Sequence, residues 1–267
     1  MILLLVVWLS GCSSVGTSNN PYFESVDGPT LTPASDTFFD LIRLPPPAGR
    51  ISVAIYRFPD QTGQFREAGQ SSFSTAVTQG SGALLTTALL DSGWFRPLER
   101  EGLQDLLTER RIIRQIRDDV PNLRQASLML DGGIIAYETN TATGGVGARY
   151  FGLGVSEQYR VDQVTVNLRA IDVNSGEILV SVLTTKTIFS QKMEGDLFRF
   201  VRNQRLLEAE AGYSINEPRY LAANDAISAA VVHLVVQGVE QNLWRLGNEE
   251  DRLHPVISAY RSAYQDR

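Results

Sequence analysis

The stretch from Thr143 to Asp162, TGGVGARYFGLGVSEQYRVD, contains five glycines within its first twelve residues. Glycine-rich loops commonly bind phosphate groups, because their backbone amides can approach an anion closely. The spacing here does not favour that chemistry. The run Gly145-Val146-Gly147 lacks the third glycine of the dinucleotide-binding motif, and no GK[ST] phosphate loop occurs in the chain. The residues that follow alternate in character with a period of two, which indicates β-strands instead.

The histidines and the cysteine are too few to build a metal centre or a Cys/His active site. The chain has two histidines, His233 and His254, and one cysteine, Cys12. A zinc site and a disulfide are therefore disfavoured, and His233, within an apolar helical segment, is expected to be a structural residue. We predict no catalytic residue, no metal site and no cofactor, so the chain is not expected to be an enzyme. The net charge of −6 argues against a nucleic-acid partner, because phosphate neutralisation needs clustered Lys and Arg.

The position of Cys12 predicts a different chemistry, the attachment of lipid. Residues 2–9 form an apolar run, which is long enough for the core of a signal peptide and too short to cross a bilayer as a helix. Leu-Ser-Gly-Cys follows, the pattern of a bacterial lipobox, so residues 1–11 are predicted to be a signal peptide and Cys12 the lipidated residue. Ser13 stands where lipoproteins retained in the inner membrane usually carry Asp, which favours the outer membrane. The alternative interpretation is a buried N-terminal strand with a cysteine there by chance.

Strands and helices alternate along much of the remaining chain. Residues 12–48 are rich in Ser, Thr, Asn and Pro and are predicted to be an extended, lipidated tether. Residues 49–141 and 217–267 are predicted to form a periplasmic α/β domain. Within it we expect strands at Arg50–Phe58, Trp94–Leu98 and Ser127–Thr139, helices at Ser74–Leu90, Glu99–Arg117 and Tyr220–Leu246, and a long loop over Pro59–Phe73.

The spacing of apolar residues predicts which face of each element is buried. The expected core positions are Ile51, Val53 and Ile55 in the first strand, Ala83, Leu84, Thr87 and Ala88 in the first helix, Leu103, Leu106, Leu107, Ile112, Ile113 and Ile116 in the second, and Ile227, Val231, Leu234 and Val235 in the last.

Two further regions alternate between apolar and polar residues over the length that a tilted strand needs to cross a bilayer. Residues 142–163 are predicted to form a first transmembrane hairpin with a turn at Gly152–Gly154, and residues 189–216 a second, with a turn near Arg202–Asn203. Residues 164–188 between them are predicted to form a periplasmic hairpin that turns at Asn174–Gly176. The polar side chains expected to face a water-filled lumen are Arg149, Gln158, Arg160, Asp162, Glu208 and Glu210.

Two such hairpins cannot close a membrane barrel alone. They supply four strands, whereas the smallest closed barrels have about eight, and an open strand edge cannot face lipid because its backbone groups would be unpaired. If the hairpins span the membrane, several copies of the chain must therefore share one barrel. The predicted fold class is α+β, a periplasmic α/β domain with two transmembrane β-hairpins that join an oligomeric β-barrel.

Two other interpretations remain open at this point. Antiparallel strands with one wet face are also normal in soluble sheets. The chain would then be a monomeric periplasmic lipoprotein whose soluble α/β domain binds a partner or an envelope polymer. The third interpretation is a nucleotide or sugar enzyme that uses the glycine-rich stretch.

Eight blocks of sequence, in one order, resemble the CsgG family of outer-membrane lipoproteins, the curli secretion channels. They are DQTGQF (60–65), FSTAV (73–77), WFRPLER (94–100), GLQDLLTERRIIR (102–114), GGVGARYFG (144–152), NSGEIL (174–179), FRF (198–200) and QRLLEAEAGY (204–213). The similarity extends from about Thr30 to Tyr260.

The resemblance implies a nonameric ring in the bacterial outer membrane, with two hairpins from each protomer in one barrel above a periplasmic vestibule. It implies export of unfolded curli-type amyloid subunits without ATP, with periplasmic capping and extracellular accessory curli proteins as partners. In the family, the long loop after the first strand forms a narrow constriction. Carried over by position, Phe73 supplies its aromatic ring, Ser72 stands at the Asn position and Ala68 at the Tyr position. One ring of phenols is then missing, so the constriction is expected to be wider or less adhesive.

Overall fold

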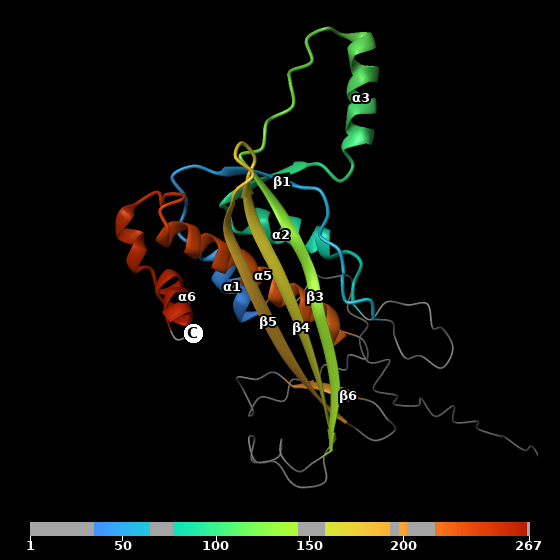
Figure 1. Cartoon of the computed structure of the whole chain (residues 1–267), viewed down its shortest axis with the longest axis vertical. Helices are drawn as coiled ribbons and strands as arrows, with labels where there is room; N and C mark the ends of the chain where they lie inside the picture. The colour runs from blue at the N-terminus through green and yellow to red at the C-terminus, as the bar shows by residue number, and fades with distance from the viewer. Residues whose placement is uncertain (1–34, 65–76, 144–157, 193–197, 202–216, 266–267) are drawn as a thin grey trace, which may run out of the picture. The chain divides into compact units, whose positions relative to one another are not determined.

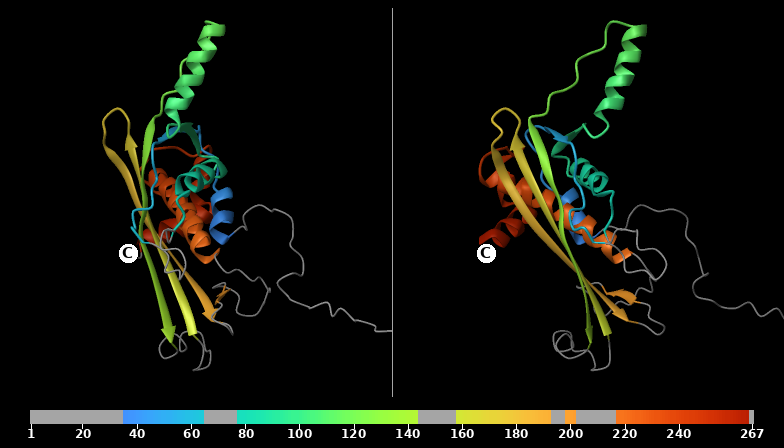
Figure 2. Two further views of the ribbon diagram at one scale, coloured as in Figure 1. Left: turned by 90° about the vertical axis from the view of Figure 1, so that its right-hand side faces the viewer. Right: turned by 45° about the vertical axis from the view of Figure 1, so that its right-hand side comes forward.

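A six-stranded mixed sheet with helices packed on one face forms the centre of the computed structural model (Figures 1 and 2). The structure describes residues 35–64, 77–143, 158–192, 198–201 and 217–265. The strands lie in the order β2-β1-β3-β4-β5-β6. This mixed architecture confirms the predicted α+β class, whereas the transmembrane hairpins and the shared barrel stay predictions.

The sheet has a short parallel part and a long antiparallel part. β1 (Ile51–Ile55) is parallel to β2 (Phe95–Glu99) and to β3 (Leu128–Thr143), whereas β3, β4 (Gln158–Asp172), β5 (Ile178–Lys192) and β6 (Phe198–Val201) are antiparallel in succession. The three strands predicted for the α/β domain are therefore confirmed. The burial of β1 differs from its prediction. Ser52 and Ala54 are buried as well as Val53 and Ile55, and Ile51 is only half-buried.

β4 has one face on the core and one toward water. Its buried apolar residues are Val164, Val166, Leu168 and Ala170, and partly exposed residues alternate with them at Gln163, Thr165, Asn167 and Arg169. This period of two is typical of an antiparallel strand that is covered on one side.

The predicted turn at Asn174–Gly176 joins β4 to β5 and is confirmed. Gly176 has a φ of +75°, a conformation that favours glycine. Asp172 Oδ1 accepts hydrogen bonds from the backbone amides of Asn174 and Ser175, both at 2.8 Å. The Asp side chain thus replaces a backbone acceptor at the tip of the hairpin.

α5 (Glu217–Glu240) is the central helix, and it packs on β4 and β5. The predicted core positions Ile227, Val231, Leu234 and Val235 are all fully buried, which confirms its inner face. α1 (Asp36–Ile42) and α2 (Ser81–Asp91) cover its other side. Residues 219–240 are long and apolar enough to cross a membrane, yet 72% of the 18-residue apolar window within them is buried inside the domain, which is typical of a core helix.

α5 ends at Glu240 rather than at the predicted Leu246. Asn242 has a φ of +56°, which stops the helix. The chain then turns back, so that the Trp244 ring lies against Gly238. Trp244 Nε1 donates to the Val235 carbonyl at 3.0 Å. The turn at Asn242 and the packing of this indole back on the helix, rather than the apolar pattern, set the end of the helix.

The predicted tether is too long at its C-terminal end. Ser35 caps α1 by accepting from the Phe38 amide at 3.1 Å, and Leu41 is fully buried. The Pro-rich segment is also held in place, because the Trp94 indole donates to the Pro45 carbonyl at 2.8 Å. Residues 36–48 therefore belong to the folded domain. Their composition resembles a linker, and only the contacts of α1 with α5 reveal the helix.

The remaining helices depart from prediction in their starts or faces. α2 begins at Ser81 rather than Ser74, and its buried side chains are Ser81, Leu85, Ala88 and Leu89, whereas Ala83 and Thr87 are exposed. η1 (Glu249–Leu253) and α6 (Pro255–Gln265) were not predicted. α6 joins the domain through Tyr260, whose hydroxyl donates to Asp40 Oδ2 on α1 at 3.1 Å.

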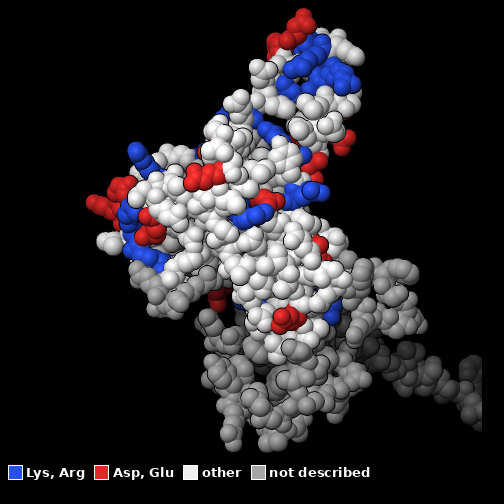
Figure 3. Space-filling view, in the orientation of Figure 1, with Lys and Arg blue, Asp and Glu red and all other residues white. Residues whose placement is uncertain are grey.

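α3 (Leu103–Ile116) confirms the predicted helix but not its predicted buried face. The helix extends away from the sheet (Figure 1), and none of its residues is buried. Ile116 is 81% exposed. Basic side chains gather at this end of the molecule in the space-filling view (Figure 3), and the sequence of α3 contains Arg111 and Arg114. The amphipathic pattern therefore has no partner among the described residues of this chain.

Candidate functional site

The loop that follows β1 is attached to β3 at its first residues. The Ile134 amide donates to the Pro59 carbonyl at 3.1 Å, and the Gln61 amide donates to the Ile134 carbonyl at 2.8 Å. Asp60 therefore forms a parallel β-bridge with Ile134. The start of the loop is in effect a one-residue strand added to the edge of β3.

The two ends of this loop are tied to each other. Ser81 Oγ, at the start of α2, donates to the Phe58 carbonyl at 2.5 Å, and Ser81 is fully buried. Closer to the surface, Gln79 Nε2 donates to Asp60 Oδ2 at 3.2 Å. Asp60 Oδ1 accepts from the Thr62 amide at 2.9 Å. We call these four residues, Phe58, Asp60, Gln79 and Ser81, the loop root.

Gly133 on β3 leaves the space that the loop root occupies. A Cβ at this position would lie 2.4 Å from the Pro59 carbonyl oxygen, which is closer than a methyl group tolerates. Gly132 beside it has a φ of +153°, and a Cβ there would lie 2.1 Å from the Asn167 carbonyl oxygen. Glycine inside a strand often marks such a close approach of backbones, and here it brings the loop against the sheet.

The four long strand ends lead away from the helix-covered part of the sheet. β3 pairs with β4 as far as Thr143 and Gln158, and β5 pairs with β6 from Phe189 to Lys192. Phe198 on β6 pairs with Lys192 at the end of β5, so the chain has already reversed its direction before Phe198. This pairing contradicts a reversal near Arg202–Asn203, residues that lie outside the described part of the chain.

Asp162 on β4 does not face open water. Its side chain is 1% exposed, and Arg219 Nε on α5 lies 3.9 Å from Oδ1. The Tyr137 hydroxyl on β3 donates to the same oxygen, and the Arg219 guanidinium lies over the Tyr137 ring, 5.3 Å from its centre. This burial contradicts the prediction that Asp162 faces a lumen. The reason is that the N-terminal turn of α5 covers this face of β4.

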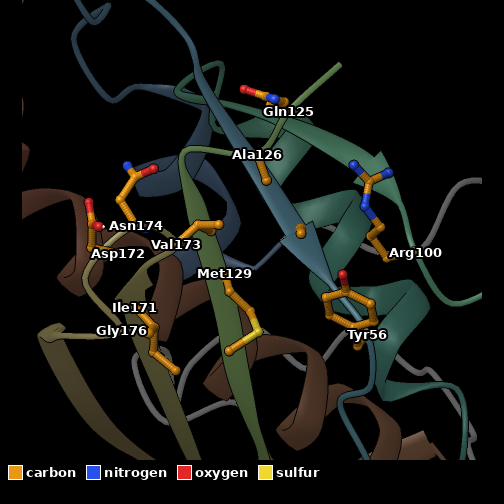
Figure 4. Close-up of a pocket in the computed structure, with 11 residues that line it drawn as sticks. Tyr56, Arg100, Gln125, Ala126, Met129, Ile171, Asp172, Val173, Asn174 and Gly176 are labelled. Carbon is orange, nitrogen blue, oxygen red and sulfur yellow. Dashed lines mark hydrogen bonds between the residues drawn. The ribbon is translucent and has the colours of Figure 1, made fainter. Parts of the chain in front are cut away.

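A partly open cavity of about 480 Å³ lies at the other end of the sheet, beside the β4–β5 turn (Figure 4). Tyr56, Met129 and Ile171 contribute to its lining. The Arg100 guanidinium donates to the Glu99 and Arg124 carbonyls at 2.8 and 3.0 Å. The Asp172 carboxylate binds its own turn, and the amides of Ser175 and Asn174 lower the pKa of this group. Both charged side chains of the cavity therefore hold backbone in place.

The described residues also provide no cluster that could bind a metal. No group of three or more His, Cys, Asp or Glu side chains among them has the arrangement of a metal site. His233 lies between two tyrosine rings of α6, with ring centres 4.6 Å from Tyr260 and 5.1 Å from Tyr264. These edge-on contacts support the structural role predicted for His233.

The sequence matches the family described as "Curli production assembly/transport component CsgG" over residues 34–263. The chain belongs to the CsgG family. Among its relatives, the curli production assembly/transport component CsgG of Salmonella typhimurium strain LT2 is 45% identical over 271 residues, which cover 98% of this chain and 96% of that protein. The component of the same name from Escherichia coli strain K12 is 45% identical over 270 residues, 97% of this chain and 95% of that protein.

Solved structures add little to this assignment. The hypothetical protein CT253 from Chlamydia trachomatis is 12% identical, with a TM-score of 0.38 over 71% of this chain and 97% of that one. A likeness at this level bears no weight. The resemblance to the CsgG family that the sequence blocks predicted is thus confirmed by sequence alone.

Most of the predicted site residues lie outside the described residues. These are Cys12, Ala68, Ser72, Phe73, Arg149, Glu208 and Glu210. Gln158 and Arg160 belong to the first residues of β4, and their role stays a prediction. The structure describes the two ends of the loop that carries Phe73, and it brings them together at the loop root.

The residues of the loop root were not predicted from the sequence. Two signals could have found them. Asp60 precedes Thr62 at the spacing of a turn in which an Asp side chain accepts from the backbone two residues later. The adjacent Gly132 and Gly133 inside a strand indicate a close approach of another segment. Neither signal identifies Gln79 as the partner of Asp60, because Gln79 lies 19 residues further along the chain.

Proposed function

We propose that this member of the CsgG family forms an oligomeric pore in the bacterial outer membrane and exports unfolded curli-type subunits without ATP. In this proposal the hairpins at residues 142–163 and 189–216 join those of other copies in one barrel. The helix-covered part of the sheet is the periplasmic domain. Nine copies, lipid attached at Cys12, and periplasmic and extracellular accessory partners are carried over from the family.

The observation that best supports the shared barrel is that two edges of the sheet have no neighbouring strand among the described residues. Among the described residues, residues 136–143 of β3 pair with β4 only, and β6 pairs with β5 only. These two edges belong to the strand ends that lead into the predicted hairpins. Edges of this kind cannot face lipid, because their amides and carbonyls would have no hydrogen-bond partner. Pairing with the edges of neighbouring copies satisfies them.

The length of the strands also supports a pore wall. β3 has 16 residues, and β4 and β5 have 15 each, which is long for strands of a small domain. Between the two predicted membrane hairpins, within residues 164–188, the open face of the sheet carries polar groups that bond to one another, as expected for the water-exposed part of the same strands. Thr165 and Thr185 share a hydrogen bond of 3.0 Å, and Asn167 Nδ2 donates to the Val182 carbonyl at 3.2 Å.

The constriction is assigned to the loop after β1, on the family pattern. Phe73 supplies the ring that restricts leakage while an extended chain slides past, and Ser72 and Ala68 lie near it in the sequence. The aromatic side chain is apolar and rigid, so it can contact many different residues of an unfolded polypeptide without binding one of them tightly. Movement needs no nucleotide in this mechanism, because captured substrate leaves a confined space and gains entropy.

Electrical recording from planar bilayers tests the proposal directly. Purified full-length chain is expected to give discrete conductance steps, and Phe73→Ala is expected to raise the step size by widening the constriction. Phe39→Ala is the control, because Phe39 lies on α1 and is 40% exposed, away from the strand ends. The control should leave the step size unchanged.

Two outcomes would contradict the proposal. A small particle in detergent that gives no conductance steps would support the monomeric periplasmic lipoprotein instead. For the anchor, mass spectrometry of the mature chain is decisive: an unmodified Cys12 with residues 1–11 still attached would exclude lipidation at this residue.

A further inference from the structure

We propose that Asp60 and Gln79 are positioning residues that fix the loop after β1 against β3 and thereby set the conductance of the pore. This inference rests on the proposed function, since it concerns the loop assigned to the constriction. Neither residue needs to contact the exported chain. Their contribution is to hold both ends of the loop in one place.

Asp60 connects three parts of the molecule. Its backbone forms the bridge to Ile134, so it joins the loop to β3. One carboxylate oxygen accepts from the Thr62 amide and orders the first turn of the loop, while the other accepts from Gln79 at the far end. Since β3 continues into the first predicted hairpin, the loop and the wall strand share one rigid attachment.

The loop root contains one buried and one exposed link. The buried Ser81 hydroxyl bonds to a backbone carbonyl, so it fixes the start of α2 and belongs to the core. The link between Gln79 and Asp60 is exposed and lies on the loop side of Ser81. It joins the two ends of the loop on the side where the loop leaves the domain, so it sets the direction in which both ends point.

Gly133 gives this attachment its close fit. The Pro59 carbonyl lies where any side chain at residue 133 would be, and Gln61 Nε2 lies 3.4 Å from the same point. The loop therefore cannot shift along β3 without losing both hydrogen bonds to Ile134. If the loop root is fixed in every copy of the oligomer, the same side chain of each copy lies at the same height along the pore axis. A narrow ring of side chains requires this.

A reciprocal exchange of the two side chains tests the inference. Gln79→Glu places two carboxylates together, and their repulsion should open the contact. The double variant Asp60→Asn with Gln79→Glu should restore it, because the new amide donates to the new carboxylate while its own oxygen still accepts from the Thr62 amide. Glu249→Gln is the matched control, since it weakens an exposed 2.8 Å pair with Arg252 on η1, remote from the loop root.

Two measurements on the full-length oligomer follow. Hydrogen exchange in peptides covering Gln61 and Ile134 should become about five-fold faster in Gln79→Glu, the effect of losing one ordinary hydrogen bond. Single-pore recordings of this variant should show a changed mean conductance and greater open-pore noise. The double variant and Glu249→Gln should match the wild type in both measurements.

Each contrary result has a definite meaning. Unchanged exchange in Gln79→Glu, or a double variant that does not recover, would overturn the claim that this pair holds the loop. Faster exchange with unchanged conductance and noise would overturn the claim that the pair sets the pore. If the wild type itself formed no pores, the proposed function would fall and this inference with it, a result distinguishable from both others.

Discussion

Lys186 Nζ on β5 lies 2.8 Å from Asp225 Oδ2 on α5, in an interface that is otherwise mostly apolar. The Asp225 side chain is 9% exposed and the Lys186 side chain 39% exposed. Beside this pair, the buried Thr184 hydroxyl donates to the Ala226 carbonyl at 2.8 Å. Apolar contacts alone would allow α5 to slide or rotate on the sheet. These two polar contacts select one position of the helix on β5.

Lys186→Met is expected to lower the free energy of unfolding by about 2 kcal/mol. It leaves the Asp225 carboxylate buried without its cation, and the cost stays below that of a fully buried pair because Lys186 is partly exposed. Adding Asp225→Asn should recover most of this loss. Denaturation by guanidinium chloride, monitored by tryptophan fluorescence, gives the free energy of unfolding of the single and the double variant.

The control for this pair is Arg117→Met. Arg117 and Asp119 are 3.6 Å apart, and their side chains are 60% and 82% exposed, so the change should cost less than about 0.5 kcal/mol. Equal losses in Lys186→Met and in the double variant would show that the lysine stem, and not its charge, stabilises this interface.

Tyr137→Phe is expected to cost about 2 kcal/mol, because it removes the hydroxyl that donates to the buried Asp162 carboxylate. Tyr56→Phe is the matched control, since Tyr56 is 49% exposed at the rim of the cavity and should show almost no change. Chemical denaturation compares the two variants. If Tyr137→Phe were as stable as the wild type, Asp162 would need no hydroxyl donor from β3.

Gly238→Ala is expected to destabilise the domain by about 3 kcal/mol through overpacking. A Cβ at Gly238 would lie 1.8 Å from the Trp244 ring, whereas one at Gly49 would meet nothing within 4 Å. Displacement of Trp244 should shift tryptophan fluorescence to longer wavelength. Gly49→Ala should leave both stability and spectrum unchanged, and a Gly238→Ala variant with the wild-type spectrum would contradict the close packing.

Stability is expected to fall at alkaline pH because of Tyr260. Burial, and then the nearby charge and hydrogen bond of Asp40, raise the pKa of this phenol. A raised folded-state pKa means that the folded chain holds the proton more tightly. The resulting stabilisation is complete below the unfolded tyrosine pKa of about 10 and is lost as the pH rises toward the folded-state pKa.

The comparison of wild type with Tyr260→Phe isolates this contribution. Between pH 8 and pH 11 the wild type should lose about 1 kcal/mol more free energy of unfolding than the variant, which has no proton to release at this position. Denaturation curves at the two pH values give the difference. A loss of the same size in both proteins would assign the alkaline effect to other groups.

Local patterns in the sequence predicted the helices, strands and turns that depend mainly on neighbouring residues. The apolar period of α5, the turn at Asn174–Gly176 and the position of β2 follow from a few neighbouring residues, and the structure confirms them. α1 was missed because seven residues in a Pro-rich segment have little helical preference of their own. Its one fully buried residue, Leu41, becomes a core residue only through contact with α5.

Side-chain faces were harder to predict than elements. The apolar stripe of α3 predicted a buried face, but the described chain offers nothing to cover it. The alternation at the start of β4 assigned Asp162 to water, yet the structure buries it. A charged residue can be buried when an opposite charge meets it. Arg219 is 57 positions away, as the two residue numbers show, and no periodicity connects them.

By itself the sequence determined the family, the alternating strands and the core helix, because each depends on residue types at short, regular spacing. The tertiary structure decided which distant residues meet. Asp60 and Gln79 are 19 residues apart, Tyr137 and Asp162 are 25 apart, and Tyr260 and Asp40 are 220 apart. Contacts of this kind leave no local pattern, since the chain between the partners is free to vary. They arise only when the sheet and its helices pack, and that packing holds the ends of the loop together.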